Sequence, residues 1–313
     1  MDKKALQRAN GRLLVLHTAL QLGALFILPL LLLPYSAVWG WLLLPIVALT
    51  NPWWSFMHEA IHGVMFADKG FNRLAGRSHA ILYGAPFDLL RWGHLLHHAY
   101  SRTPRERSEV YVAGRDSRWR VTLAYYLRLC GGLYLCEVLG GLLSLLPTSA
   151  IRRLSAHFAG PENLVGELLE RTRAAEIRRA LKFDGLVIVA LYALAFAAYG
   201  QAGWMLVLYL YGRGLLISLV DNAFHYGTPL DDVRFARNLS LPGPLSRLLL
   251  HFNLHGAHHA RARVPWSDLP ESHRQSGQGY QDEWFAAIFR QFRGPIAEHR
   301  LPRYRTAAGE ALD

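Results

Sequence analysis

Cysteine and charged residues are both scarce in this chain. Only two of its 313 residues are cysteine, Cys130 and Cys136, and both lie in one apolar segment. Two such residues provide neither a disulfide framework nor a thiolate metal site. Charged residues make up 18% of the chain, below the roughly 25% of an ordinary soluble protein. Much of the chain is therefore expected to lie in an apolar environment, where charged side chains are not tolerated.

The positive charge is not arranged for binding nucleic acid. The formal net charge is +11, and 52% of the residues are hydrophobic. The basic residues lie between the apolar stretches, as in loops held on the cytoplasmic side of a membrane. A membrane is therefore the expected partner, and nucleic acid is not.

Four apolar stretches are predicted to cross the membrane, near residues 13–33, 37–56, 186–199 and 204–220. The first is long enough to span ~30 Å of hydrocarbon. It follows Lys3, Lys4, Arg8 and Arg12, which place its N-terminal end in the cytoplasm. The links at 34–36 and 200–203 carry no charge, as expected of outside loops. We therefore expect a multi-pass protein of the cell (inner) membrane, with both termini and every long loop in the cytoplasm.

Charges inside two apolar regions need separate interpretation. Residues 121–146 contain Arg128, Glu137 and two Gly-Gly pairs, which favour a re-entrant hairpin or interfacial helices over a single span. Arg213 lies inside the last span, where a cation requires a partner, a cavity or a functional reason. The predicted fold is all-α: one integral-membrane domain over residues 1–313, with four transmembrane helices, interfacial helices and a histidine-rich cytoplasmic cap.

Nine of the fifteen histidines fall in four places that this topology brings to the cytoplasmic face. They are His58 and His62; His94, His97 and His98; His225; and His255, His258 and His259. Residues four apart share a helix face, so His58 and His62 can bind one metal. In the HLLHH segment, offsets of three and four place His97 and His98 on either side of the stripe through His94, so the triplet can supply two adjacent metals.

The number of imidazoles indicates the kind of metal. Imidazole suits iron and zinc, but eight or nine imidazoles are too many for one tetrahedral zinc. Two metals of higher coordination number fit the pattern better. The six remaining histidines are expected to be ordinary surface or core residues: His17, His79, His157, His251, His273 and His299.

Several polar residues lie near these histidines in the sequence. Carboxylates in such places can orient ligand imidazoles by hydrogen bonding to them. The candidates for this role are Glu59, Glu106, Glu109, Asp221 and Asp268, and Asn222 is a candidate weak or water-mediated ligand. For each carboxylate, the alternative is an ordinary solvated loop charge.

At these residues the chain resembles the membrane fatty-acid desaturase and hydroxylase superfamily. The resemblance covers roughly residues 13–270 and rests on the segments HEAIHG, HLLHH and HGAHH, the order of the spans between them, and the segment Val264–Pro270. It implies four transmembrane helices, a cytoplasmic cap and a diiron centre that activates O2, its co-substrate, to break an unactivated C–H bond. It also implies that the eight box histidines bind two irons, with His225 as the ninth ligand.

The resemblance extends to the partners. Related enzymes have an asparagine four residues before the ninth histidine, where this chain has Asp221, so the role of Asn222 is less secure. The chain has neither a fused cytochrome b5 motif nor a GxGxxG nucleotide site. Electrons are therefore expected from a separate ferredoxin- or cytochrome-type partner, docked by basic loops such as 102–107.

The substrate is expected to be a lipid or acyl chain that reaches the metals from the membrane. An apolar tunnel would position one methylene near the irons. Candidate tunnel residues are Tyr83, Phe87, Trp92, Tyr211 and Phe224, for each of which plain core packing is the alternative. The overall pattern favours a fatty-acid desaturase, and a hydroxylase, a carotenoid ketolase or an alkene-forming decarboxylase can use the same site.

Two alternative functions belong to other classes of protein. The first box is also an HExxH motif, in which two histidines bind zinc and a glutamate is the general base. An intramembrane zinc protease adds a distant aspartate, for which Asp184 is available, but this leaves the other two boxes and His225 unexplained. A metal transporter or storage protein would instead place ligands through the spans.

Overall fold

The computed structural model describes residues 2–302, which fold into a mostly helical structure (72%). The longer helices are α1 (Lys3–Leu22), α3 (Thr50–Ile61), α4 (Lys69–Tyr83), α5 (Phe87–Tyr100), α6 (Arg118–Leu127), α7 (Leu133–Ser144), α8 (Thr148–His157), α10 (Ala175–Tyr199) and α11 (Gly203–His225). The shorter ones are α2 (Leu43–Ala48), α9 (Leu164–Arg171), α12 (Gly243–Leu248), α13 (His255–Ala260), α14 (Leu269–Ser276) and α15 (Trp284–Arg290).

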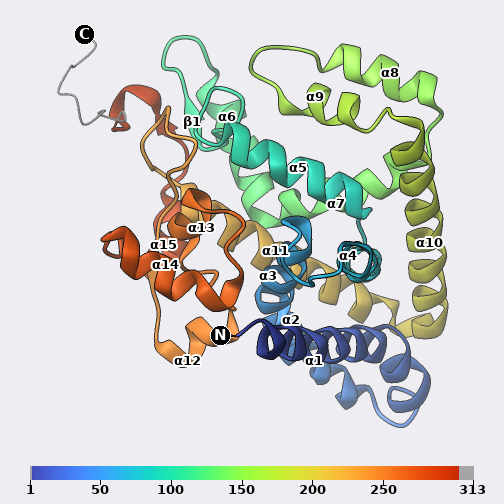
Figure 1. The fold of residues 1–313 in the computed structure, drawn as a ribbon. Coiled ribbons are helices and arrows are strands. Elements are labelled where there is room, and N and C mark those ends of the chain that lie inside the picture. Colours follow the sequence, from blue (N-terminus) through green and yellow to red (C-terminus); the bar gives the residue numbers. More distant parts are fainter. Residues whose placement is uncertain (1, 303–313) are drawn as a thin grey trace.

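The strands are two residues long and join distant parts of the chain. β1 (Val110–Tyr111) pairs in parallel with β4 (Ile296–Ala297). β2 (Leu239–Ser240) pairs in parallel with β3 (Asp282–Glu283). Figure 1 shows α12 to α15 gathered on one side of the molecule and α10 on the opposite side, with α3, α5 and α11 between them.

Local capping fixes the ends of the helices that lead to the site. The Asp68 side chain accepts a hydrogen bond from Phe71 N (2.6 Å) and begins α4, as expected of a favourable N-cap residue. Gly84 ends the same helix with φ +100°, a left-handed conformation that glycine adopts without a Cβ penalty. The turn at Gly84 lets α5, which carries three box histidines, follow at once.

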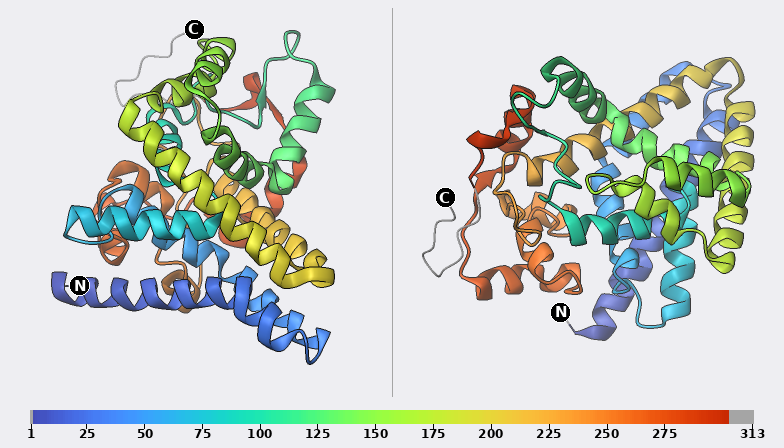
Figure 2. Two further views of the ribbon diagram at one scale, coloured as in Figure 1. Left: turned by 90° about the vertical axis from the view of Figure 1, so that its right-hand side faces the viewer. Right: turned by 90° about the horizontal axis from the view of Figure 1, so that it is seen from above.

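By length and composition, three helical stretches within residues 2–302 can cross a membrane: 3–32, 118–145 and 175–225. Their apolar side chains are widely exposed, including Val15 (69%) on α1 and Leu186 (62%) on α10, as expected of surfaces that face lipid. Figure 2 shows α1 continuing into the next segment as one long helical rod, Lys3–Leu32. The stretch 175–225 holds the predicted pair of spans, because α10 and α11 join at a 3₁₀ turn, Gly200–Ala202.

The predicted second span, 37–56, is not one continuous helix. A 3₁₀ helix (Ala37–Leu42) and α2 form a shorter apolar segment that ends at Ala48, and α3 begins at Thr50. Pro45 and Pro52 lie in this region, and proline removes helical hydrogen bonds and limits the residue before it. The count of four spans and the cytoplasmic cap therefore stay predictions. The C-terminal residues 303–313 and Met1 of the predicted domain lie outside the described residues.

The region predicted to be re-entrant or interfacial lies in a kinked helical stretch of 28 residues, Arg118–Leu145, and its placement in the membrane stays a prediction. α6 and α7 are joined by a π-helical segment, Arg128–Gly132, in which Cys130 and Gly131 have non-helical backbone angles and Gly131 has φ +107°. Kinks of this kind have identifiable local causes, and a glycine that can take a positive φ is one of them. The kinked segment begins at the charged residue Arg128.

Arg213 has aromatic partners in the interior. Its side chain is fully buried, and its guanidinium carbon lies 4.8 Å from the ring centroid of Trp53 and 5.4 Å from that of Tyr83. It also donates to the carbonyl oxygen of Tyr83 (3.0 Å). Cation–π contacts are stronger when desolvated. The aromatic rings are therefore the partner that Arg213 was predicted to require inside the span.

Candidate metal centre

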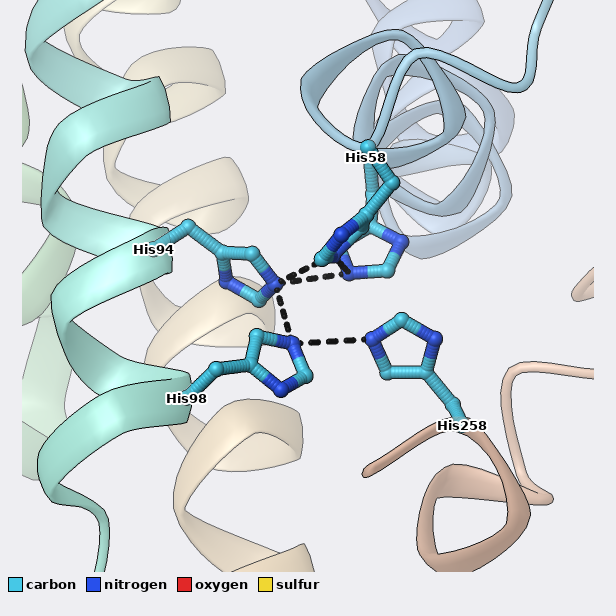
Figure 3. A group of neighbouring side chains, drawn as sticks. His58, His94, His98 and His258 are labelled. Atoms are coloured by element: carbon cyan, nitrogen blue, oxygen red, sulfur yellow. Dashed lines mark hydrogen bonds between the residues drawn. The ribbon is translucent and has the colours of Figure 1, made fainter. Parts of the chain in front are cut away.

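The first group of histidines combines residues from three helices. α3 carries His58 near its end, and His62 follows it. α5 supplies His94 and His98, which are four residues apart, and α13 supplies His258. One ring nitrogen from each of these five histidines lies within 4.8 Å of those of the others. Figure 3 shows His58, His94, His98 and His258 pointing toward a common centre.

The Nε2 atoms of this group are closely spaced. His94 Nε2 lies 2.8 Å from His58 Nε2, 3.0 Å from His62 Nε2 and 3.0 Å from His98 Nε2. His258 Nε2 lies 3.0 Å from His98 Nε2. A neutral imidazole Nε2 either donates one hydrogen or offers one lone pair. Hydrogen bonds alone therefore cannot account for three nitrogen neighbours around His94.

The second group lies beside the first. It consists of His97 from α5, His225 at the end of α11, and His255 and His259 from α13. His97 Nε2 is 3.2 Å from His259 Nε2. Among the described residues, His225 Nε2 and both ring nitrogens of His255 are buried without a hydrogen-bond partner. Buried polar atoms are normally satisfied, so these nitrogens are available to a bound ion.

The spacing of the nitrogens fits a metal with more than four ligands. At the metal–imidazole distance of about 2.0–2.1 Å known for zinc, ligands at right angles are about 2.9 Å apart and tetrahedral ligands about 3.4 Å apart. The Nε2 pairs within hydrogen-bond distance, five in the first group and one in the second, are 2.8–3.2 Å apart, and all ligand nitrogens of a group lie within 4.8 Å of one another. The residues present thus fit two metal ions, each bound by several imidazoles.

Burial keeps the imidazoles of the first group in the form that binds metals. It lowers the pKa of His62 to about 4, with Arg263 and Arg91 adding to the effect. Burial, followed by repulsion between neighbouring imidazoles, holds the pKa of His58, His94 and His258 well below the usual range. A metal-binding histidine must be neutral, so no proton has to be displaced at neutral pH.

One predicted orienting carboxylate contacts a box histidine directly. Both carboxylate oxygens of Glu106 accept from His97 Nδ1, at 2.8 and 2.9 Å. This contact leaves Nε2 of His97 with its lone pair toward the second group, which is the usual role of a carboxylate behind a ligand histidine. The tautomer follows from the hydrogen-bond network.

The other predicted carboxylates have different surroundings. Glu59 accepts from Trp266 N (3.0 Å), and burial raises the pKa of its carboxyl to about 8. Glu109 pairs with Arg102 (2.6 Å). Asp268 accepts from Ser267 Oγ (2.9 Å). None of these hydrogen bonds within residues 2–302 reaches a box histidine, so their orienting role stays a prediction.

Asp221 and Asn222 also differ in their surroundings. Asp221 lines a small polar cavity together with His97, Glu106, Arg128 and His225. Asn222 instead donates to Gln291 Oε1 (2.7 Å) and Tyr125 Oη (3.3 Å). Its amide nitrogen is therefore engaged with α6 and with the 3₁₀ helix that begins at Gln291.

A cavity of about 360 Å³ lies beside both histidine groups, because its lining includes His94 and His97. Its apolar wall is formed by Trp54, Leu89, Leu90, Leu96, Leu133, Leu164, Val165 and Leu168. The contribution of α9 was not predicted, and the only signal for it in the sequence is the apolar spacing within 164–168. Such a cavity can hold an apolar chain next to the candidate metal positions.

The five aromatic residues predicted to line a tunnel lie outside this cavity wall. Tyr83 and Phe87 are buried in the core, and the Phe224 ring stacks on His255 at 4.3 Å. Trp92 faces the guanidinium of Arg171 at 5.2 Å. Tyr211 lines a separate apolar cavity of about 630 Å³ between α7, α10 and α11. The packing alternative describes Tyr83, Phe87 and Phe224 best.

The three arginines of loop 102–107, predicted to dock an electron donor, form ion pairs with carboxylates of the same chain. Arg102 is 1% exposed and pairs with Glu109 at 2.6 Å. Arg105 pairs with Glu167 (2.6 Å) and Arg107 with Glu298 (2.9 Å). Neutralised arginines attract an acidic partner weakly, and docking of an electron donor at this loop stays a prediction. The sequence spacing gave no sign of these partners, which are up to 191 residues away.

The helical architecture and the two histidine groups define a class, helical membrane proteins with a histidine-rich candidate metal centre. Within that class, residues 33–289 match the family model described as fatty acid desaturase. The match covers most of the chain, and the protein therefore belongs to the fatty acid desaturase family, as the histidine boxes predicted. Family membership implies an oxidoreductase that acts on lipids. Neither a curated protein nor a solved structure matches the chain significantly.

Proposed function

We propose that the protein is a diiron, O2-dependent oxidoreductase that acts on unactivated C–H bonds of a lipid acyl chain, most simply as a fatty-acid desaturase. The observation that carries the proposal is the meeting of five and four imidazoles, from four separate stretches of the chain, in two adjacent groups. The rings of His98 and His259, one from each group, are 4.3 Å apart between centroids. Two metals held this way are neighbours.

The chain's own residues would hold and orient the two irons. His58, His62, His94, His98 and His258 are the proposed ligands of one, and His97, His225, His255 and His259 those of the other. Glu106 fixes the ring of His97. When bound, the two irons supply the reductive activation of O2 that an unactivated C–H bond requires.

The leucine-lined cavity would hold the acyl chain and exclude water from it. Desaturation removes two hydrogens from the chain and reduces O2 to two waters, with two electrons and two protons from outside. We therefore propose a separate ferredoxin- or cytochrome-type donor, and a cell (inner) membrane location with the histidines on the cytoplasmic side.

The zinc-protease reading receives no support from the site. Asp184, its predicted third ligand, forms an ion pair with Arg77 (2.5 Å) and belongs to neither histidine group. Five nitrogens in the first group also exceed the four ligands of tetrahedral zinc.

Expression of the full chain in a bacterial host tests the proposal. Mass spectrometry of the host lipids should show new double bonds in acyl chains, and the purified protein should contain about two irons per chain. Hydroxylated or ketolated lipids, or terminal alkenes, would move the assignment to another reaction of the same site. A protein that holds a single zinc and changes no lipid would overturn it.

A further inference from the structure

The segment that follows the third histidine box carries a row of exposed phenylalanines. Phe285, Phe289 and Phe292 are 52%, 69% and 46% exposed. They lie on α15 and on the 3₁₀ helix after it, Gln291–Arg293. Spacings of four and three residues put neighbouring members of the row on one side of the segment. A contiguous apolar patch of this kind marks a contact surface.

The other side of this segment is held on α11. Trp284 is buried, and its ring centroid lies 5.7 Å from that of Phe224, near the end of α11. Gln291 is fully buried and donates to the carbonyl oxygen of Leu219 (2.8 Å). Both α11 residues belong to the stretch 175–225, which can cross a membrane. The phenylalanine row is therefore fixed beside the end of that stretch.

The same segment also contacts α6, where another stretch that can cross a membrane begins. Tyr125 Oη donates to the carbonyl oxygen of Gln291 (2.7 Å), and Tyr126 Oη donates to that of Phe292 (2.9 Å). α6 has an exposed apolar row of its own, at positions four residues apart on one helix face: Trp119, Leu123 and Leu127. Two elements that contact each other thus both present apolar side chains to their surroundings.

Three exposed arginines accompany these rows. Arg118 and Arg120 flank Trp119 at the start of α6, and Arg293 ends the 3₁₀ helix that carries the last phenylalanine. Among residues 2–302, these three arginines form no ion pair with a carboxylate. Aromatic rings beside unpaired basic residues are typical of the membrane–water interface, where anionic headgroups attract arginine.

The charge of this surface argues against a second copy of the chain as its partner. Within residues 282–293, Arg290 pairs with Asp282 (2.8 Å), and Glu283 caps the start of α15, at the end away from the contact with α6. The end that contacts α6 is therefore positive. In a symmetric dimer this surface would meet itself, and its unpaired arginines would repel their own copies. Anionic lipid headgroups carry the opposite charge.

We propose that the phenylalanine row inserts into the interfacial layer of the bilayer, and that the three exposed arginines contact anionic lipid headgroups. The inference rests on the membrane location of the chain and goes beyond the proposed reaction. It has a consequence for the histidines. β3, directly before α15, pairs with β2, and Asn238, directly before β2, holds α13. The contact with lipid would therefore set the depth of the three box histidines on α13 relative to the membrane surface.

Spin labels on single cysteines distinguish lipid, water and protein as the surroundings of a side chain. The full chain, with Cys130→Ser and Cys136→Ser, is placed in nanodiscs made of equal parts phosphatidylcholine and phosphatidylglycerol. Phe289→Cys is the test site. Leu186→Cys, at a widely exposed position on α10, is the lipid reference, and Arg274→Cys, at an exposed position on α14 outside the three apolar stretches, is the water reference.

The label at Phe289→Cys should resemble the lipid reference. Its accessibility to O2, which dissolves in hydrocarbon, should exceed that of the Arg274→Cys label several-fold, relative to a neutral, water-soluble nickel chelate. Phe285→Cys repeats the measurement at the other end of the row, so that the test stands if one labelled variant does not fold.

The arginines are tested by varying the lipid. The lipid exposure of the label at Phe289→Cys should rise as phosphatidylglycerol replaces phosphatidylcholine, because the headgroups then attract the arginines. Replacing all three with glutamine, Arg118→Gln, Arg120→Gln and Arg293→Gln, should abolish this rise. Arg152→Gln, at an exposed position on α8, is the matched control and should leave it unchanged.

Three results would overturn the contact. One is a label at Phe289→Cys that is as open to the nickel chelate as the one at Arg274→Cys, and the same result at Leu186→Cys would overturn the membrane location as well. Another is a label shielded from both reagents, because a protein surface then covers the row. The third is a rise with phosphatidylglycerol that survives loss of the arginines. None of these readouts needs iron or turnover, so the proposed reaction can fail independently.

Discussion

At the level of single residues, the consecutive histidines of the second box separate the two groups. His94 and His98 lie in the first group and His97 in the second. Because offsets of three and four place His97 and His98 on either side of the stripe through His94, one helix can serve two neighbouring ions. A single turn of α5 thus sets the spacing of the proposed centre.

Replacing one histidine in each group tests this division. We expect His258→Ala and His97→Ala each to abolish iron loading and turnover, because a buried multi-ligand site loses an essential nitrogen. Metal analysis by mass spectrometry and product analysis measure the two effects. His157→Ala, at an exposed position in α8 outside both groups, is the control. Full activity in either ligand variant would contradict the assignment.

A second prediction at this scale concerns the carboxylate behind His97. Glu106→Ala removes the acceptor of the His97 Nδ1 hydrogen bond. Loss of such an orienting group lowers metal affinity about 10–100-fold, and Glu106→Gln, which keeps an acceptor oxygen, should lose less. Chelator competition measures the affinity. An unchanged affinity in Glu106→Ala would show that the contact does not orient the ligand.

How far the sequence predicts the site depends on the range of the interaction. The ligand candidates His58 and His62 were predictable because helical spacing alone brings them together. The engagement of Asn222 with Gln291, and the burial of Arg102 against Glu109, were not, because they arise from tertiary packing. The packing of Tyr83 and Phe224 in the core, outside the lining of the cavity, has the same origin.

At the level of elements, the short helix α13 depends on a glycine within its histidine box. A Cβ on Gly256 would press on the carbonyl oxygen of Ala236 and lie 2.9 Å from Asn238 Nδ2. Asn238 Oδ1 accepts from Ala257 N (2.9 Å), so the segment before β2 positions the helix. Close approach of backbone to backbone explains why the box reads HGAHH.

Gly256→Ala is therefore expected to displace three histidines at once. Overpacking of this kind costs about 1–3 kcal/mol, and we expect reduced iron content with a lower unfolding temperature. Gly11→Ala is the matched control, because nothing lies within 4 Å of its added Cβ. Equal iron content in both variants would contradict the close packing of α13.

The kinked helix also shows why element boundaries were harder to predict than ligands. Charge and glycine in 121–146 favoured a re-entrant hairpin or interfacial helices, and the structure has a kink at Arg128–Gly132 in this region. The kink is set by the non-helical backbone angles of Cys130 and Gly131, which hydropathy does not reveal.

At the level of the whole molecule, the proposed centre connects helices that otherwise lie far apart in the sequence. Its residues come from α3, α5, α11 and α13. Metal binding to the folded state stabilises a protein by about 4 kcal/mol per site when free metal exceeds Kd a thousandfold. Iron is thus expected to contribute to stability as well as to chemistry.

Removing iron from the purified protein with a chelator should therefore lower its unfolding temperature by about 10 °C. Thermal unfolding in detergent, followed by circular dichroism, measures the change, and adding Fe²⁺ back should restore it. The His258→Ala variant should show no response to chelator. A chelated wild-type protein that unfolds at its original temperature would argue against the shared centre.

The position of α13 has a consequence for biosynthesis. Four of the nine imidazoles belong to the last third of the chain: His225 ends the last apolar stretch, and the three on α13 are translated after it. A nascent chain that has already entered the membrane can therefore offer only an incomplete set of nitrogens. Cofactor insertion must wait until the ribosome has released most of the remaining polypeptide, and a prematurely terminated product would stay inactive however well its membrane part is inserted.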